Sequence, residues 1–144
     1  MTTILLPPVP PLAAARRYLL DELAARSNSL PVGVEPPEGE PRPYALLSRP
    51  GTNTDVFLGH FLLRLRVFDT DVVRLERNAD LLHRLMLHAK HKRIVVPPAE
   101  DDPGGAVWIS NATHEFGPAD NDDPDVPMFG LHSAVFWTIG LKPS

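Results

Sequence analysis

The chain has 144 residues, a formal net charge of −4 at neutral pH and no cysteine, so disulfides and thiolate metal sites are excluded. This length fits one domain that buries most of its unfolded surface. With 17 prolines in 144 residues, the proline content is more than twice the globular average of about 5%. However, 43% of the residues are hydrophobic, which argues against a disordered linker. With no secretory signal and no stretch of about 20 apolar residues, we expect a protein that folds in a cytoplasm.

Acidic and basic side chains concentrate in different parts of the sequence. Residues 60–96 carry eight basic and four acidic side chains, whereas residues 97–127 carry eight acidic side chains and no basic ones. The acidic segment would repel phosphate, and the chain lacks the broad basic stripe of a DNA-binding surface. Segments of opposite charge suit a head-to-tail contact between identical subunits, although two solvated surfaces are the simpler explanation.

The prolines divide the chain into segments with periodic apolar residues. Residues 1–11 contain two proline pairs, which disfavour helix, so we expect an extended arm. A helix is expected from residue 12 to about residue 27, because four apolar residues share one helical face, namely Leu12, Ala15, Leu19 and Leu23. After a proline-rich stretch with a short strand at residues 32–35, we expect a strand over Tyr44–Ser48 and a turn over Gly51–Asp55.

Residues 56–68 alternate between two faces, which is typical of a half-buried strand. One face is apolar and predicts the core side, with Phe57, Phe61, Leu63, Leu65 and Val67. The other face is mixed, with Leu58, His60, Leu62, Arg64, Arg66 and Phe68. Asp69 to Asp71 then ends the strand and caps a helix over about residues 72–89, because short polar side chains satisfy the free N–H groups of a first turn.

Three further strands are expected at residues 94–96, 106–116 and 128–141, separated by acidic loops. Consecutive strands with short connections favour antiparallel pairing. We therefore predict an α+β fold, with a mainly antiparallel sheet of four to five strands and two helices packed on one face. It forms a single domain over residues 12–144 behind the extended arm of residues 1–11. The second face of this sheet still carries large apolar residues, which indicates self-association: Leu58, Leu62, Phe68 and Phe136.

No motif indicates catalysis, and we expect a protein that is not an enzyme and needs no cofactor or metal. His88 and His91 have the spacing of a helical ligand pair, but lysines lie between and after them. The segment Asp120–Asp125 fails the calcium-loop pattern at its sixth and twelfth positions. The remaining support for a ligand site is a set of histidines on expected strands that could meet, namely His60, His114 and His132.

Four segments carry a resemblance: the helix over residues 12–25, the proline-framed strand Pro43–Ser48, the strand and helix cap Leu63–Asp71, and the closing strand Leu131–Leu141. Their order over roughly residues 12–142 resembles the tail terminator proteins of long-tailed bacteriophages, especially those of actinobacterial hosts. The resemblance implies a structural protein of the virion tail, assembled in the host cytoplasm. It would form a hexameric ring that ends polymerisation of the tail tube.

That resemblance also implies partners: further copies of the chain, the major tail tube protein and a neck protein at the head–tail junction. DNA would pass through the lumen without specific binding, and no membrane is involved. The candidate interface residues combine the mixed sheet face, the acidic loops and a cationic helix end, namely Leu58, Leu62, Arg64, Arg66, Phe136, Glu100, Asp101, Asp102, Asp120, Asp122, Asp123, Asp125, Lys90, Lys92 and Arg93.

Two alternatives stay open. One is a head-closure or stopper protein of the same neck, although such proteins usually have more barrel-like strands and the helix near residues 72–89 favours the terminator. The other is a small enzyme or ligand-binding α+β domain, which would need a pocket with convergent polar groups.

Overall fold

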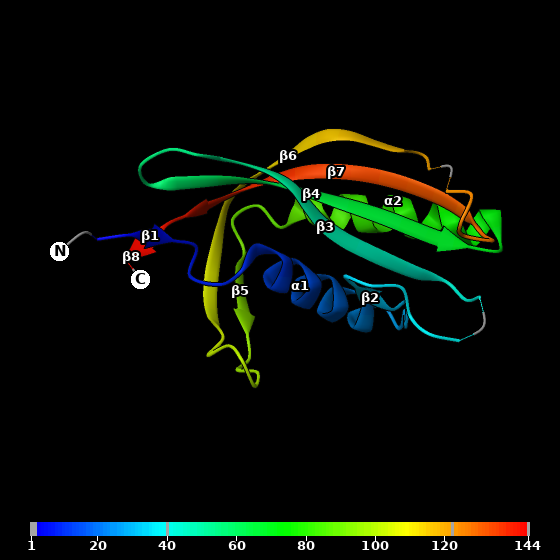
Figure 1. The fold of residues 1–144 in the computed structure, drawn as a ribbon, viewed down its shortest axis with the longest axis horizontal. Coiled ribbons are helices and arrows are strands. Elements are labelled where there is room, and N and C mark those ends of the chain that lie inside the picture. The colour runs from blue at the N-terminus through cyan, green and yellow to red at the C-terminus, as the bar shows by residue number, and fades with distance from the viewer. Residues whose placement is uncertain (1–2, 40, 122, 144) are drawn as a thin grey trace.

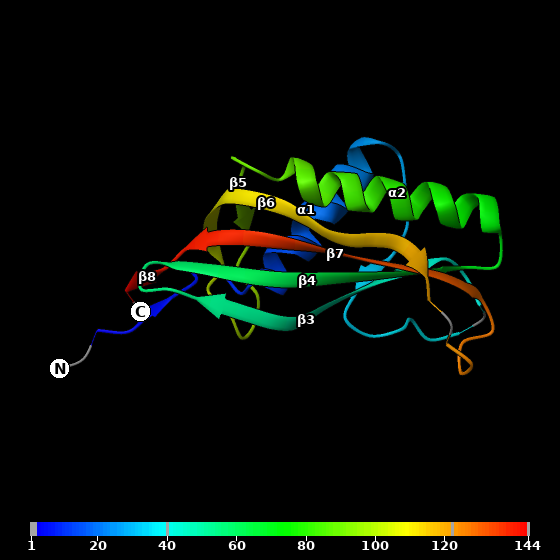
Figure 2. The same cartoon turned by 90° about the horizontal axis from the view of Figure 1, so that it is seen from above.

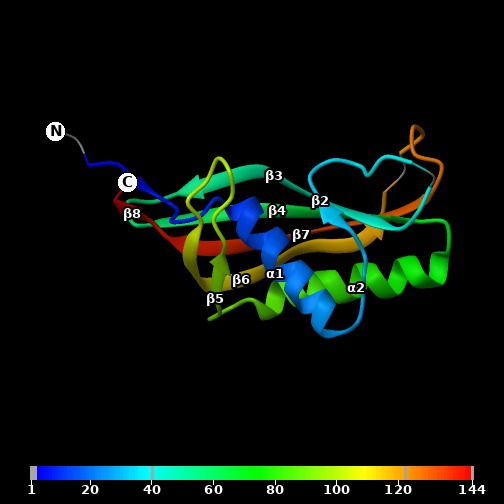
Figure 3. The ribbon, with the colours of Figure 1, turned by 90° about the horizontal axis from the view of Figure 1, so that it is seen from below.

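The structure is a computed structural model that describes residues 3–39, 41–121 and 123–143. Figures 1 and 3 show two helices packed on the same side of a long, curled sheet. In chain order the elements are β1 (Leu5–Leu6), α1 (Pro11–Ala25), β2 (Val32–Gly33), β3 (Tyr44–Thr54), β4 (Leu58–Asp69), α2 (Val72–His88), β5 (Arg93–Val96), β6 (Gly105–Asp120), β7 (Phe129–Gly140) and β8 (Lys142–Pro143).

The main sheet has six strands in the order β2-β3-β4-β7-β6-β5, and every neighbouring pair is antiparallel except β2 and β3. The predicted α+β fold with a mainly antiparallel sheet is therefore confirmed, but four to five strands is wrong. Both edge strands are short, with two residues in β2 and four in β5. The short strands expected at residues 32–35 and 94–96 correspond to these two elements, and both join the sheet.

β1 and β8 form a separate two-stranded sheet that joins the two ends of the described chain. The described residues before α1 include β1, and they are not free of the core. Val9 is fully buried in the main core cluster, and Pro11 is a buried residue in the first turn of α1. Proline suits that position because the N–H it lacks would have no helical partner there.

The strand expected to end at Ser48 runs on as β3 to Thr54. The pairing of β3 with β4 shifts between Ser48 and Gly51, and this irregularity contains Pro50. A bulge tolerates a residue that has no N–H for the ladder. The turn falls instead at Asp55, whose carboxylate accepts hydrogen bonds from the backbone N–H groups of Phe57 and Leu58. Phe57 consequently lies in the turn and is 69% exposed, so its predicted core position is wrong.

Both helices lie on one face of the sheet, as Figure 3 shows from the helical side. The helix α2 contacts β4, β6 and β7, while α1 contacts β2, β3 and β5. Asp71 caps α2 as predicted, because its side chain accepts hydrogen bonds from the N–H groups of Val73 and Arg74. Neither helix of the described residues has the length and apolar character to cross a bilayer.

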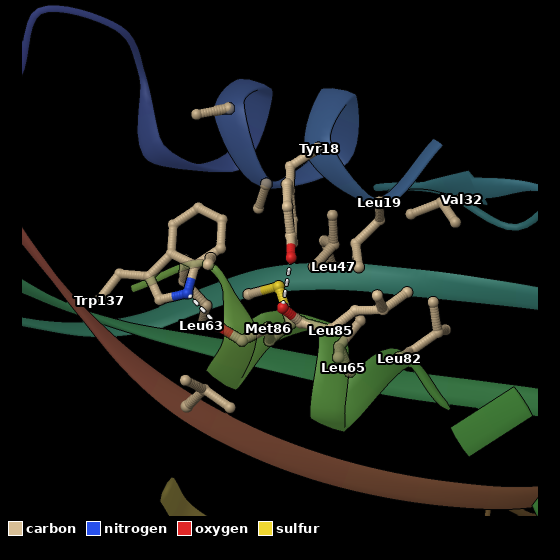
Figure 4. Close-up of a cluster of buried hydrophobic side chains, with 14 of the residues drawn as sticks. Tyr18, Leu19, Val32, Leu47, Leu63, Leu65, Leu82, Leu85, Met86 and Trp137 are labelled. Atoms are coloured by element: carbon tan, nitrogen blue, oxygen red, sulfur yellow. Dashed lines mark hydrogen bonds between the residues drawn. The ribbon is translucent and has the colours of Figure 1, made fainter. Parts of the chain in front are cut away.

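Two aromatic side chains connect the layers of the core (Figure 4). The Tyr18 hydroxyl of α1 donates to the carbonyl oxygen of Leu85 at 2.7 Å, and the Trp137 indole N–H of β7 donates to that of Met86 at 2.9 Å. Both acceptors lie near the end of α2, where carbonyl groups begin to lack helical partners. Burial raises the pKa of Tyr18 to about 12, with the charge of Glu22 adding to the effect. The phenol is therefore a neutral donor at physiological pH.

Candidate subunit interface

The face of the sheet opposite the helices has no helix over it, as Figure 2 shows. On β4 the alternate residues from Leu58 to Arg66 point to this open face and are half-buried. The partner strand places Phe136 directly opposite Leu62, and Gly140 opposite Leu58. The predicted set of Leu58, Leu62, Arg64, Arg66 and Phe136 thus shares one continuous surface. We call it the open face.

Two arginines occupy the central part of the open face. Arg64 Nη2 lies 3.3 Å from the side-chain oxygen of Asn121, to which it donates, and 3.1 Å from Nδ1 of His132. Its Nε is buried and has no hydrogen-bond partner among the described residues. Neither Arg64 nor Arg66 forms an ion pair with any residue that the structure describes. An unpaired guanidinium beside apolar side chains favours contact with an acidic partner.

His132 lies beside these arginines and packs edge-to-face on Phe116, with ring centroids 4.9 Å apart. Burial lowers the pKa of His132, and the positive charges of Arg64 and Arg66 lower it further. A neutral imidazole can accept from Arg64. His60 lies elsewhere on the open face, where Nδ1 is 2.9 Å from the Thr138 hydroxyl. The histidines of the open face therefore bind separate neighbours.

His114 lies on the helical side of the sheet, away from His60 and His132. Its Nδ1 is 2.8 Å from Nε2 of His83, which is buried on α2. The pairing of β6 with β7 shifts between Ile109 and Asn111, and this irregularity reverses the side to which later residues point. The three histidines on strands do not form one cluster. Among the described residues, no group of three or more histidine, aspartate or glutamate side chains could hold a metal ion.

The two acidic segments have different positions. The loop that joins β5 and β6 carries Glu100 and Asp101, which are exposed, and it projects to the helical side of the sheet (Figures 1 and 3). Asp102 is half-buried there, and its carboxylate accepts a hydrogen bond from the N–H of Gly104 at 2.7 Å. This loop therefore offers two exposed acidic side chains on the side opposite Arg64 and Arg66.

The second acidic segment lies between β6 and β7, at the end of the sheet near the first turn of α2. Asp120 and Asp123 line a cavity of about 440 Å³ together with Val72 and Phe129. Asp125 is exposed, and Asp122 lies outside the described residues. Nearby, Val126 and Met128 pack on a small apolar cluster of Tyr44, Leu46 and Phe68. That packing explains why Phe68, expected on the open face, is 1% exposed.

The predicted cationic residues are separated as well. Lys92 Nζ lies 3.7 Å from the carboxylate of Glu22 and 5.6 Å from the centre of the Tyr18 ring, so it connects to α1. Lys90 is exposed after the end of α2, and Arg93 is exposed in β5. Directly opposite Arg93 on β6 is Trp108, which is 52% exposed. Sequence reasoning did not single out Trp108, although an exposed tryptophan beside cations is typical of binding surfaces.

The chain was also compared with known proteins. No protein-family model matches it, and no curated protein matches it.

Proposed function

We propose that this protein is a structural component of a phage tail, a terminator that forms a ring, expected to be hexameric, on the end of the tail tube. The proposal starts from the resemblance in element order over residues 12–142. The observation that carries it further is the open face, a large part of a six-stranded sheet that combines apolar side chains with arginines that form no ion pair with a described residue. A surface of this composition suits a protein neighbour.

The arrangement of charge supports contacts between identical subunits. The arginines of the open face and the carboxylates of Glu100 and Asp101 point to opposite sides of the molecule. Different patches that meet between copies make a heterologous contact, and such contacts close into rings when the rotation permits. Acidic loops would also not adhere to DNA that passes through a lumen.

A head-closure or stopper protein of the same neck is the second candidate, and the helix between β4 and β5 favours the terminator over it. A small enzyme or ligand-binding domain has less support. That alternative depended on a cluster of His60, His114 and His132, and these histidines lie on two sides of the sheet. The cavity of about 440 Å³ at the start of α2 is lined mainly by acidic and apolar residues and by Asn121, and no basic side chain of the described residues lines it.

Native mass spectrometry over a range of protein concentrations tests the proposal, with electron microscopy of the same samples. A ring of six subunits is the expected result. Adding the protein to polymerising tail tube protein should then yield tubes with one capped end and a restricted length. A protein that stays monomeric and leaves tube length unchanged would contradict the proposal. If that monomer also gained thermal stability from a small molecule, the ligand-binding alternative would replace it.

A further inference from the structure

Trp108 forms one wall of a cavity of about 330 Å³ at the end of the molecule where the termini meet. Leu58 and Pro8 supply apolar lining, and Arg93 and Lys142 supply positive charge. No acidic residue lines this cavity, and neither cation forms an ion pair with a described residue. The site therefore combines a flat aromatic side chain with two free cations.

A second aromatic ring lies near the indole. The ring of His91 lies parallel to that of Trp108, with an interplanar angle of 7° and centroids 6.2 Å apart. His91 does not line the cavity, whereas Trp108 does. The histidine thus lies parallel to the indole as a neighbour outside the cavity.

The opposite end of the molecule presents a segment with matching chemistry. Residues 34–39 have the sequence Val-Glu-Pro-Pro-Glu-Gly, and all of them are exposed. They belong to the loop between β2 and β3, which lies far from β5 along the longest axis in Figures 1 and 2. The side chains of Glu35 and Glu38 form no ion pair among the described residues. We call this segment the proline loop.

We propose that the proline loop of one copy docks in the Trp108 cavity of the next copy. Two consecutive prolines favour the polyproline II conformation, which aromatic grooves bind because it is already ordered. The prolines would pack on the indole, and the flanking glutamates would pair with Arg93 and Lys142. A cavity of about 330 Å³ lies at the small end of the range for ligand pockets, which suits a contact of two prolines.

The two surfaces lie at opposite ends of one subunit, so a copy cannot satisfy both by itself. In a row of bound copies, the copy at one end keeps an open proline loop and the copy at the other end keeps an open cavity. The contact therefore propagates head-to-tail until the row of subunits closes. The inference rests on the self-association proposed above and adds to it one specific contact between neighbours. It also gives the exposed tryptophan and the proline loop a common role.

Charge reversal with rescue in trans tests the contact. One variant carries Glu35→Lys and Glu38→Lys, and the other carries Arg93→Glu and Lys142→Glu. Each pure variant would face like charges at every loop–cavity contact, so we expect its subunit dissociation constant to rise roughly tenfold or more. In an equimolar mixture every contact between unlike variants joins opposite charges again. The mixture should therefore recover the wild-type mass in sedimentation velocity, with the two variants alternating.

Matched controls separate this contact from a general effect of charge. Asp80→Lys with Glu115→Lys changes net charge as the loop variant does, and Arg77→Glu with Arg84→Glu matches the cavity variant; all four side chains are exposed. Both controls should keep the wild-type mass. Circular dichroism melts establish that each variant is folded, and a blocked peptide of residues 33–39 supplies a second measurement. It should change the fluorescence of the wild-type protein but not of a Trp108→Phe variant.

The outcomes distinguish this inference from the proposed function. A wild-type ring whose mass is unchanged in both charge variants, together with a peptide that leaves the fluorescence unchanged, would overturn the loop–cavity contact and leave the ring in place. Dissociation of the two variants without recovery in the mixture would also overturn it. A monomeric wild-type protein that nonetheless binds the peptide would support the contact and count against the ring.

Discussion

The junction between β4 and α2 depends on one ion pair whose removal should be measurable. Asp69 is fully buried, and its carboxylate accepts hydrogen bonds from Arg74 Nε at 2.6 Å and Nη2 at 2.8 Å. It accepts a third from the backbone N–H of Asp71 at 2.9 Å. Arg74→Ala would leave a buried carboxylate with backbone donors only. Losing one partner of a fully buried pair costs about 3–5 kcal/mol.

The Arg74 side chain is 52% exposed, so water can replace part of what it supplies. We therefore expect Arg74→Ala to lower the free energy of unfolding by about 2–3 kcal/mol, below the range for a fully buried pair. At about 4 °C for each kcal/mol in a chain of this size, the melting temperature should fall by about 8–12 °C. Arg74→Lys keeps the charge but loses the bidentate geometry, and its effect should be intermediate.

The pH dependence supplies the refutation. The Arg74 guanidinium, assisted by the backbone N–H of Asp71, holds the pKa of Asp69 below its usual value. A carboxyl group with a lowered folded pKa stabilises fully above its unfolded pKa, near 3.9, and loses that contribution as the pH falls toward the folded pKa. Urea titrations measure the free energy of unfolding at each pH. The difference in this free energy between wild type and Arg74→Ala should thus be constant from pH 6 to 7 and shrink below about pH 4. A difference under about 0.5 kcal/mol at pH 7, the level of an ordinary surface substitution, would refute the reasoning.

Three more predictions concern the core, the sheet and the arm, and urea unfolding measures each. Tyr18→Phe should cost about 1–2 kcal/mol, because the buried carbonyl of Leu85 loses its side-chain donor; an unchanged midpoint would contradict this. Gly117→Ala should cost about 1–3 kcal/mol, because φ is +81° and the new methyl group would overlap the backbone of His132. Deleting residues 1–6 should leave the fold intact, whereas Val9→Ala should cost about 2 kcal/mol from lost core packing; equal losses in both would show that the early arm is structural.

Local patterns allowed the long elements to be predicted from the sequence. The alternation in β4 correctly assigned Phe61, Leu63, Leu65 and Val67 to the core, because a half-buried strand repeats every two residues. The cap of α2 was predicted within Asp69–Asp71, because the N–H groups of a first turn need an acceptor close in sequence, and Asp71 supplies it. In both cases the physical cause lies within a few residues.

The failures arise where contacts distant in sequence decide. Phe57 lies outside the alternation because Asp55 places the turn later than Gly51 suggested. The pairing of β1 with β8 joins the two ends of the described chain, and no local period signals it. Sequence reasoning did not identify Trp108 as part of a surface site. The register of β5 and β6 places Arg93 beside it, and that register cannot be read from local sequence.

Some residues of the candidate interface could be grouped from the sequence, and others could not. The five candidate residues of the open face share one surface because strand alternation determines which side each faces, and the register sets Leu62 opposite Phe136. The charged residues could not be grouped from the sequence, because loop direction controls where they lie. Lys92, which lies between α2 and β5, pairs with Glu22 of α1, and the Asp102 carboxylate accepts a hydrogen bond from the N–H of Gly104. Only the structure separates such residues from the exposed side chains of Glu100 and Asp101.

The directions of the free surfaces bear on whether assembly closes. A two-fold dimer joins one patch to its own copy, whereas here the proline loop and the Trp108 cavity lie at opposite ends of the subunit. A contact between opposite ends repeats without limit unless each step rotates the next copy by a fixed fraction of a turn. The open face with its arginines lies along the length of the subunit, so it can supply the second contact that fixes this rotation. Leu62→Glu places a charge among the apolar side chains of the open face and should weaken this second contact. Electron micrographs should then show open filaments or short chains in place of rings, whereas the loop variants should dissociate to single subunits.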